Sequence, residues 1–237
     1  MAERPDLRER GGELGGVWPE FMHHDPVANR FFGRVRTERS AFQFFAWDEG
    51  ADELAAEGNS LPTAWDGDVG TLPSDGIDAV LAAGFAESAP TPTVLCALQI
   101  MVVPSRQGGG ISRLMIERMR ELVHHHGFSK LIAPVRPSWK SRYPLTPIES
   151  YVTWRRPDGT LLDPWLRTHE RLGAEIVAIA PRSMTISGKV ADWETWTGMV
   201  FPESGSYIVP GALVPIEIDR ERDRGLYIEP NVWMVHG

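Results

Sequence analysis

The alternation of apolar and polar positions is clearest in the middle of the chain. VLCALQIMVV, from Val94, is apolar on both faces, which predicts a strand at the centre of a sheet. The next run has the spacing of an amphipathic helix that ends at Gly127, and KLIAPVRP, from Lys130, returns as a second buried strand. The apolar side of the helix is formed by Ile111, Leu114, Met115, Leu122 and Val123. This order predicts a βαβ unit with parallel strands and a right-handed crossover.

The first part of the chain shows mixed helical and strand patterns. WPEFMHHDPVANRFFGRV, from Trp18, predicts one helix, and AFQFFAWDEG, from Ala41, predicts a short strand closed by a turn. A second strand is expected in ELAAEGNSLPTAW, from Glu53, with an interruption near Gly58 and Asn59. SDGIDAVLAAGF then predicts a helix, and a Pro-rich stretch follows it.

The last part of the chain also combines helix and strand. PWLRTHERLGA, after Asp163, predicts a short helix that stops at Gly173, and EIVAIAP predicts a strand. ALVPIEIDRERDRGLYIEPNVWMV predicts two strands joined by a charged turn. The whole pattern predicts an α/β fold with a mixed sheet, in one domain spanning residues 17–237.

Composition and charge narrow the function classes. The 237 residues carry a net charge of −8, which argues against nucleic acid or an anionic membrane as a partner. A single cysteine, Cys96, excludes an internal disulfide and a cysteine-based zinc site, so no metal is expected. Residues 1–16, charged and Gly-rich, predict a flexible tail rather than a signal peptide, and the protein is expected to be cytoplasmic.

Three consecutive glycines, Gly108 to Gly110, separate the central strand from the helix. The first N–H groups of a helix are unpaired and favour an anion, and glycine removes side chains that would obstruct a phosphate. A Walker loop does not match, because Ile111-Ser112 replaces the required Lys and Ser or Thr. A dinucleotide fingerprint does not match either, because Arg113 stands where a glycine is required. A tight turn without a ligand is the remaining alternative.

The stretch VPSRQGGGIS, Val103 to Ser112, resembles the Q/R-x-x-G-x-G/A signature of the GCN5-related N-acetyltransferases. Gln107, Gly110 and Ser112 occupy its three defined positions, with Ser in place of the usual small residue. THERLGA is similar to the helix near the end of that family's domain. The resemblance covers roughly Val94 to Val177.

The resemblance implies a mixed sheet whose two central strands splay apart around an acyl-CoA. It places the CoA pyrophosphate on the backbone amides of the glycine turn and the pantetheine along the end of the preceding strand, around Gln99 to Val103. The cofactor-binding residues expected on this basis are Ile100, Met101, Val102, Val103, Gln107, Gly108, Gly109, Gly110, Ile111 and Ser112.

The resemblance also suggests acid and base groups. The family's usual tyrosine acid falls on His169, which is a departure, and a packing or capping histidine is the alternative. The central strand lacks the family's frequent glutamate and offers only Gln99. Glu20 and His24, four residues apart on the predicted first helix, are the candidates to relay a proton, although a half-exposed amphipathic helix is the better explanation of each residue taken singly.

The connection from Arg136 to Asp163 is long for this family and forms an insertion before the last helix. It holds five basic residues against three acidic, with two tryptophans and two tyrosines. We expect a flap that binds the acceptor through Trp139, Arg142, Tyr143 and Trp154, with an acceptor that carries a carboxylate or phosphate beside its amine. The alternative is that these arginines pair with nearby acids or with CoA phosphates.

These features predict an acyltransferase that moves an acetyl or other short acyl group from acyl-CoA to the amine of a small molecule. Direct attack in a ternary complex is the expected mechanism, and a homodimer is the assembly allowed for. The rival function is a non-catalytic acyl-CoA-binding sensor of the same fold, favoured by the missing glutamate and by His169.

Overall fold

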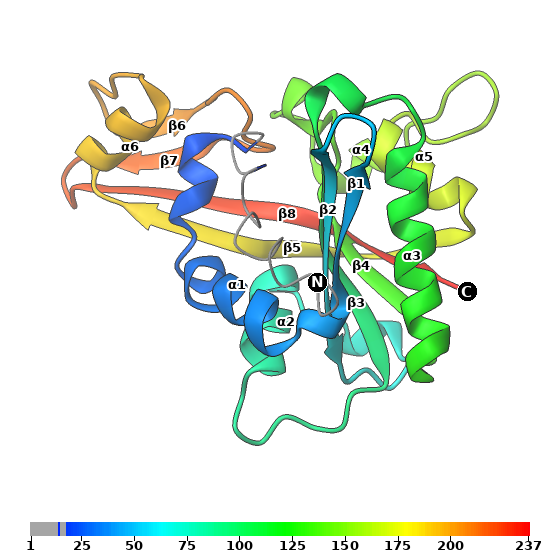
Figure 1. The fold of residues 1–237 in the computed structure, drawn as a ribbon. Coiled ribbons are helices and arrows are strands. Elements are labelled where there is room, and N and C mark those ends of the chain that lie inside the picture. Colours follow the sequence, from blue (N-terminus) through cyan, green and yellow to red (C-terminus); the bar gives the residue numbers. More distant parts are fainter. Residues whose placement is uncertain (1–13, 15–17) are drawn as a thin grey trace.

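A computed structural model describes residue 14 and residues 18–237 of the chain (Figure 1). The flexible tail predicted for residues 1–16 lies outside the described residues, apart from Leu14. Within this part of the chain, none of the helices has the length and apolar character that a bilayer crossing requires.

The predicted first helix is in fact two helices. A 3₁₀ helix, η3, spans Glu20–His24, and α1 spans Pro26–Glu38. Asp25 separates them because its side chain caps α1 by accepting a hydrogen bond from the N–H of Ala28 (2.7 Å), and Pro26 occupies the first helical position. The prediction of one continuous helix from Trp18 was therefore wrong at Asp25-Pro26.

Eight strands in the described part of the chain form one sheet in the order β1-β2-β3-β4-β8-β7-β6, with β5 paired to β8. The mixed α/β class predicted from sequence is confirmed. The strands are β1 Gln43–Asp48, β2 Glu53–Thr63, β3 Val94–Val102, β4 Leu131–Val135, β5 Ala174–Gly188, β6 Gly205–Tyr207, β7 Ile216–Asp219 and β8 Arg224–His236. The remaining α-helices are α2 Gly76–Gly84, α3 Ile111–His126, α4 Ile148–Tyr151, α5 Pro164–Arg171 and α6 Val190–Thr197, and short 3₁₀ helices span Ser40–Phe42, Val69–Thr71, Pro104–Arg106 and Lys140–Arg142.

The interruption predicted near Gly58 and Asn59 is a bulge within one continuous strand. β2 keeps its pairing with β3 on both sides of a register shift between Asn59 and Ser60. Gly58 is needed there because a Cβ atom would lie 2.5 Å from the ring of Phe44.

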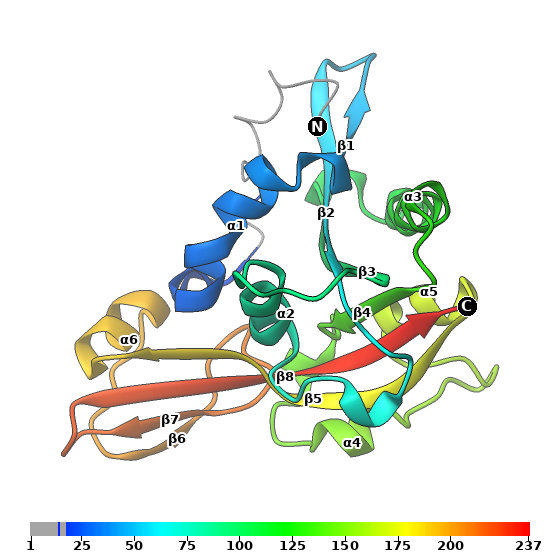
Figure 2. The same ribbon diagram turned by 90° about the horizontal axis from the view of Figure 1, so that it is seen from below.

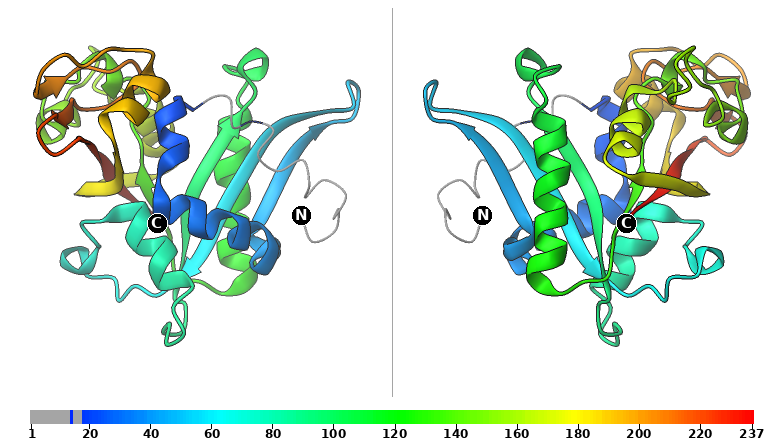
Figure 3. Two further views of the ribbon diagram at one scale, coloured as in Figure 1. Left: turned by 90° about the vertical axis from the view of Figure 1, so that its left-hand side faces the viewer. Right: turned by 90° about the vertical axis from the view of Figure 1, so that its right-hand side faces the viewer.

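The parallel strands β3 and β4 pair over a very short length. Only Leu95 with Leu131 and Cys96 with Ile132 are in register, and beyond them the two strands diverge. Figure 3 shows the two halves of the sheet leaning away from each other. The predicted βαβ unit and splayed central strands are both confirmed.

Strands β5 and β8 pair antiparallel to form a long ribbon. The pairing runs from Ala174 opposite His236 to Gly188 opposite Gly225. The strand predicted at EIVAIAP thus continues to Gly188. At the far end of this ribbon lie α6, β6 and β7, of which the sequence pattern predicted only β7 (Figure 1).

Helices cover both faces of the sheet, with α1 and α2 on one side and α3 and α5 on the other (Figure 2). The two largest hydrophobic clusters of the described residues hold these layers together. The first contains Phe31, Val35, Leu81, Ile186 and Trp233, and the second contains Leu95, Ile116, Met119, Leu166 and Met234.

Two carboxyl groups share a buried site beneath α1 and α2. Asp25 is fully buried, and Asp78 accepts a hydrogen bond from the N–H of Thr185 (3.2 Å). Burial raises the pKa of Asp78 to about 8, and the nearby charge of Asp25 acts in the same direction. Oδ2 of Asp25 and Oδ1 of Asp78 are buried without a hydrogen-bond partner among the described residues. A proton held between the two carboxyls would satisfy both oxygens.

This carboxyl pair predicts a stability that falls with rising pH. The folded pKa of Asp78 lies above the unfolded value, so its stabilisation is complete at about pH 4 and is lost as pH rises to about 8. Asp78→Asn keeps an acceptor for Thr185 and supplies a permanent donor to Asp25, so we expect it to remove most of the decline. Thermal melts from pH 5 to 9 measure the decline, because each kcal/mol lost from the free energy of unfolding lowers the melting temperature by roughly 2–4 °C.

Asp75→Asn is the matched control, because Asp75 begins the same helix but is exposed and pairs with Arg182 (2.8 Å). Its melting profile should keep most of the wild-type slope, because the charge of Asp75 adds less to the pKa shift of Asp78 than burial and Asp25 do. An Asp78→Asn profile as steep as the wild type would show that the pair does not share a proton.

Candidate active site

The glycine turn leaves the start of α3 open to a ligand. Gly108 and Gly110 have φ values of +79° and +84°, which only glycine adopts at low cost, and a Cβ atom at either position would meet nothing within 4 Å. Gly110 is the N-cap and supplies no capping side chain. Within the described part of the chain, no protein group accepts from the N–H groups of residues 108–112. These donors therefore face solvent, as an anion site requires.

The side chains around the turn hold its shape. Nε2 of Gln107 donates to the carbonyl of Val102 (3.2 Å), which ties the turn to the end of β3. Arg106 pairs with Asp48 of β1 (2.7 Å) and thus points away from the helix start. The glutamine of the sequence signature therefore has a structural contact that explains its place.

The divergence of β3 and β4 opens a cleft of about 970 Å³ that begins at this turn. One wall is β3 from Ala97 to Val102, and the other is the end of β4 with the first turns of α5. Pro164, Trp165, Thr168 and His169 belong to the second wall. Since β3 has no strand partner on this side beyond Cys96 in the described chain, its backbone can pair with an extended ligand.

A second cavity, of about 280 Å³, lies on the side of β3 that faces α1. Six residues line both spaces: Trp18, Ile77, Leu98, Gln99, Met101 and Met184. The two cavities therefore meet at β3 near Leu98 and Gln99. His23, Asn29, Phe32 and Arg36 line the small cavity alone.

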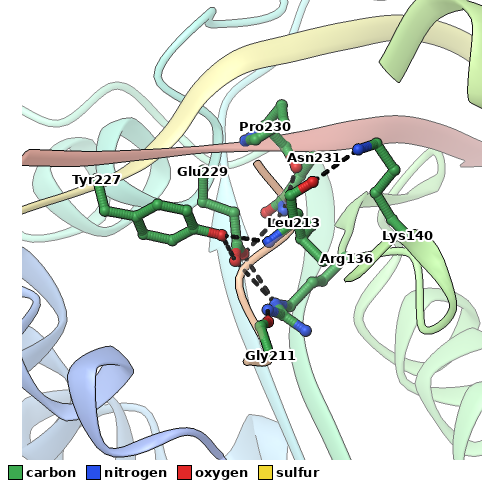
Figure 4. A network of polar contacts seen from close by, with 8 residues as sticks. All are labelled: Arg136, Lys140, Gly211, Leu213, Tyr227, Glu229, Pro230 and Asn231. Carbon is green, nitrogen blue, oxygen red and sulfur yellow. Dashed lines mark hydrogen bonds and ion pairs between the residues drawn. The ribbon is translucent and has the colours of Figure 1, made fainter. Parts of the chain in front are cut away.

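An ion pair between Arg136 and Glu229 belongs to the lining of the large cleft, and Figure 4 shows its contacts. Arg136 donates from Nε to both carboxylate oxygens of Glu229 (2.9 and 3.0 Å), and Tyr227 donates to Glu229 as well (2.8 Å). Burial raises the pKa of Tyr227 well above its usual value, and the charge of Glu229 adds to the shift. With these donors and Asn231 (3.2 Å) around it, Glu229 is a poor candidate for a base.

His169 is on the cleft wall, where the sequence predicted a catalytic group. It is 2% exposed, and its Nδ1 lies 2.9 Å from Nε2 of His236. Burial lowers the pKa of His169 to about 3, with the neighbouring His236 acting in the same direction, so the ring is neutral at physiological pH. Its Nε2 is buried without a partner among the described residues. His169 can therefore act through a hydrogen bond at Nε2, not as an imidazolium acid.

The sequence could not have identified His236 as the partner of His169. The two residues are 67 positions apart, and only the pairing of β8 beside β4 and β5 brings them together. Arg136 and Glu229 are likewise 93 positions apart.

The structure places the other predicted catalytic residues away from both cavities. Glu20 and His24 do meet each other (3.3 Å), but His24 stacks on Trp196 of α6, with 4.0 Å between ring centroids. His23 lines the small cavity instead. The break at Asp25 explains the difference, because a 3₁₀ helix turns every three residues and presents different side chains than an α-helix does.

The four predicted substrate-binding residues pack within the insertion 136–163. The guanidinium of Arg142 lies over the ring of Trp139 (4.4 Å), and the rings of Tyr143 and Trp154 are 5.0 Å apart. None of the four lines either of the two cavities described above. Their role in substrate binding stays a prediction.

Asp163 holds this insertion to α5. Its carboxylate accepts from the N–H groups of Trp139 and Trp165 and from the hydroxyl of Tyr151, at 2.7 to 2.9 Å. Lys140 is fully buried and donates to the carbonyls of Tyr143 and Leu213, and burial lowers its pKa to about 8. Among the described residues, no group of three or more His, Cys, Asp or Glu side chains could hold a metal ion.

The glycine turn at a helix start and the cleft between diverging strands define an acyl-CoA-binding α/β protein. The chain is 32% identical to the arginine N-acetyltransferase avaD of Aspergillus versicolor over 268 aligned positions, which cover 99% of the chain and 91% of that relative. No family model matches the chain. The chain belongs to the GCN5-related N-acetyltransferase superfamily and is an acyl-CoA-dependent N-acyltransferase.

Solved structures show the same fold at low sequence identity. The loading GNATL domain of CurA from Lyngbya majuscula matches with a TM-score of 0.57 and 19% identity, over 86% of this chain and 80% of that one. The GNAT-like decarboxylase GphF, in complex with isobutyryl-CoA, matches with a TM-score of 0.52 and 16% identity, over 87% and 83%.

We expect Gly110→Asp to abolish CoA binding. The carboxylate would occupy the space in front of the open amides and repel a pyrophosphate, whereas α3 itself should persist because Asp is a good N-cap. Gly127→Asp is the control, since Gly127 ends the same helix with φ +71° and equally open surroundings. Both variants carry a strain of about 1–2 kcal/mol. Calorimetric titration with CoA measures the difference, and an affinity of Gly110→Asp within twofold of wild type would contradict the assignment.

We expect His169→Phe to lower kcat by roughly 10²-fold with CoA affinity retained, because it removes the unpartnered Nε2 group from the cleft wall. His236→Phe breaks the same histidine–histidine hydrogen bond but leaves Nε2 of His169 in place, so its loss should be much smaller. Between pH 6 and 9, the pH profiles of kcat for the wild type and for His169→Phe should have the same shape, because the ring of His169 stays neutral throughout this range. Equal losses in the two variants would assign His169 a packing role.

Proposed function

We propose that the protein transfers the acetyl group of acetyl-CoA to an amine of arginine or of a closely related amino acid, by direct attack in a ternary complex. The observation that carries this proposal is the meeting of two cavities at Leu98 and Gln99 of β3. One cavity continues to the glycine turn, and the other is separate from it, so donor and acceptor can be bound together. The acceptor class follows from the similarity to an arginine N-acetyltransferase.

The residues of the large cleft fit a CoA thioester. The open amides from Gly108 to Ser112 would bind the pyrophosphate, and Arg113 and Arg171 on the cleft wall offer charge to further phosphates. The unpaired edge of β3 would hold the pantetheine through its backbone groups. Bound acetyl-CoA supplies an activated acyl group whose leaving thiolate needs a hydrogen-bond donor.

Direct attack is supported by the position of the chain's single cysteine. Cys96 is fully buried, does not line either cavity, and burial raises the pKa of its thiol. It therefore lacks the thiolate character that a covalent acyl carrier requires.

His23 is the group we propose to accept the proton of the attacking amine. It is exposed at the small cavity, whereas Glu57 pairs with Arg36 and Glu229 pairs with Arg136. The resemblance to the family implies a frequent glutamate on the central strand, but this strand offers only Gln99, and an amide cannot take up a proton. The aromatic rings of Trp18 and Phe32 offer faces for a guanidinium group.

The acyl-CoA sensor remains the rival, and thiol release separates the two functions. Acetyl-CoA is incubated with arginine, lysine, ornithine and their decarboxylated amines, and the product is identified by mass spectrometry. Formation of an acetylated amino acid supports the proposal, whereas tight CoA binding without thiol release from any mixture would favour the sensor. A cytoplasmic location and a homodimer stay predictions.

The adjacent histidines allow a matched test of the base. We expect His23→Asn to lower kcat by roughly 10² at pH 7, with a smaller loss at higher pH where the amine loses its proton unaided. His24→Asn is the control, because His24 stacks on Trp196 outside the cavities. Rates are measured by thiol release at saturating acetyl-CoA. Equal effects of the two substitutions would rule out His23 as the base.

A further inference from the structure

A chain of four polar side chains lies beneath the small cavity. Arg36 donates from Nε to Oε1 of Glu57 (3.0 Å), Asn59 donates to the same oxygen (3.0 Å), and Asn59 also donates to Oε1 of Gln99 (3.2 Å). Glu57 and Asn59 are fully buried. The chain links α1 to the central strand β3 through β2, so each member fixes the orientation of the next.

The strand register explains why these side chains meet. Asn59 of β2 stands opposite Gln99 of β3, and Glu57 lies two residues earlier on the same face of the sheet. That face is covered by α1, from which Arg36 reaches Glu57. The first and last side chains of this hydrogen-bonded series, Arg36 and Gln99, both line the small cavity. Glu57 and Asn59 lie behind it.

Two hydrogen-bond donors of this chain remain available to a ligand. Both contacts of Arg36 with Glu57 use Nε and Nη2, and Nη1 has no partner among the described residues. Gln99 accepts through Oε1, so its amide N–H₂ group is also without a described partner. The Arg36 side chain is 21% exposed and lines the cavity.

The charge of the small cavity favours an anion. The described residues that line it include no aspartate or glutamate, and Arg36 is the one permanently charged residue among them. Glu57 neutralises Arg36 from the far side, but a ligand at Nη1 would be nearer to the guanidinium than to the buried carboxylate. Charge–charge attraction falls with distance, so the net interaction with a carboxylate is favourable.

We infer that Arg36, held in place by Glu57, binds the carboxylate of the acceptor, so that the protein selects a free amino acid over the corresponding decarboxylated amine. This inference rests on the proposed function and specifies its acceptor. A cavity of about 280 Å³ accommodates an amino acid of this size, with its amine directed to His23 and the acyl group. Arg36 is thus a specificity-determining residue and takes no part in the chemical step.

The test compares L-arginine with agmatine, which keeps the guanidinium and a primary amine but lacks the carboxylate. Wild-type kcat/KM should favour L-arginine by roughly 10-fold or more. Arg36→Gln should remove most of this preference, mainly by raising KM for L-arginine, and should change the value for agmatine far less. Arg34→Gln is the control, because Arg34 lies on the same helix but forms an exposed pair with Glu38 (2.7 Å).

The variants of Glu57 separate binding from stability, since Arg36→Gln removes a positive charge that stabilises the buried carboxylate of Glu57. Glu57→Gln should keep or lower KM for L-arginine, because Arg36 loses its competing anion. The double variant Arg36→Gln/Glu57→Gln removes both charges, and the preference should stay lost even if the fold regains stability. Recovery of the preference in the double variant would show that the ion pair is only structural.

The remaining outcomes distinguish failure of this inference from failure of the proposed function. A wild-type protein that acetylates agmatine as well as L-arginine would overturn the inference while leaving amine acetylation intact. If no acetylated arginine forms, the proposed function fails. Calorimetric titration of the CoA-bound protein with L-arginine and with agmatine then tests the carboxylate site by binding alone. Binding of L-arginine that depends on Arg36 would then support the carboxylate site, and equal binding of the two compounds would overturn it.

Discussion

The early separation of β3 from β4 is the constraint on which the active site depends. Two residue pairs, at Cys96 and just before it, hold the parallel strands together, and beyond them the backbone of β3 has no strand partner on that side within the described chain. A sheet normally loses stability from such an open edge, because buried backbone groups must find hydrogen bonds. Here the edge lines a cleft that ends at the open amides of α3. The same backbone groups that the fold leaves unpaired are those that a thioester cosubstrate needs.

The sequence predicted this central region well because its signals are local. The strand at Val94, the glycine turn and the helix from Ile111 are contiguous, and each follows from spacing or from the φ values that glycine permits. The helix break at Asp25 was missed because the apolar spacing continues across it. The small α6 and β6 at the end of the β5–β8 ribbon carry no strong periodicity and were missed as well.

The candidate site was predictable only where it depends on a single segment. The CoA-binding turn required no tertiary information, whereas the acceptor side is built from η3, α1, α2, β3 and β5 together. Residues such as Arg36 and Glu57 are 21 positions apart and look like ordinary surface charges in the sequence. Choosing among Glu20, His23 and His24 required the 3₁₀ geometry of η3, because neighbouring side chains in such a short helix face the cavity or α6.

The amide at position 99 also follows from its neighbours. A glutamate there would lie opposite Asn59 and close to Glu57, so that on this buried face the guanidinium of Arg36 would have two carboxylates beside it. Like charges at that separation disfavour ionisation of the second group, and it would be held neutral or would push the strands apart. A chain that uses Glu57 to orient Arg36 therefore gains from glutamine at position 99. The proton acceptor must then come from the mouth of the cavity, where His23 is in contact with solvent.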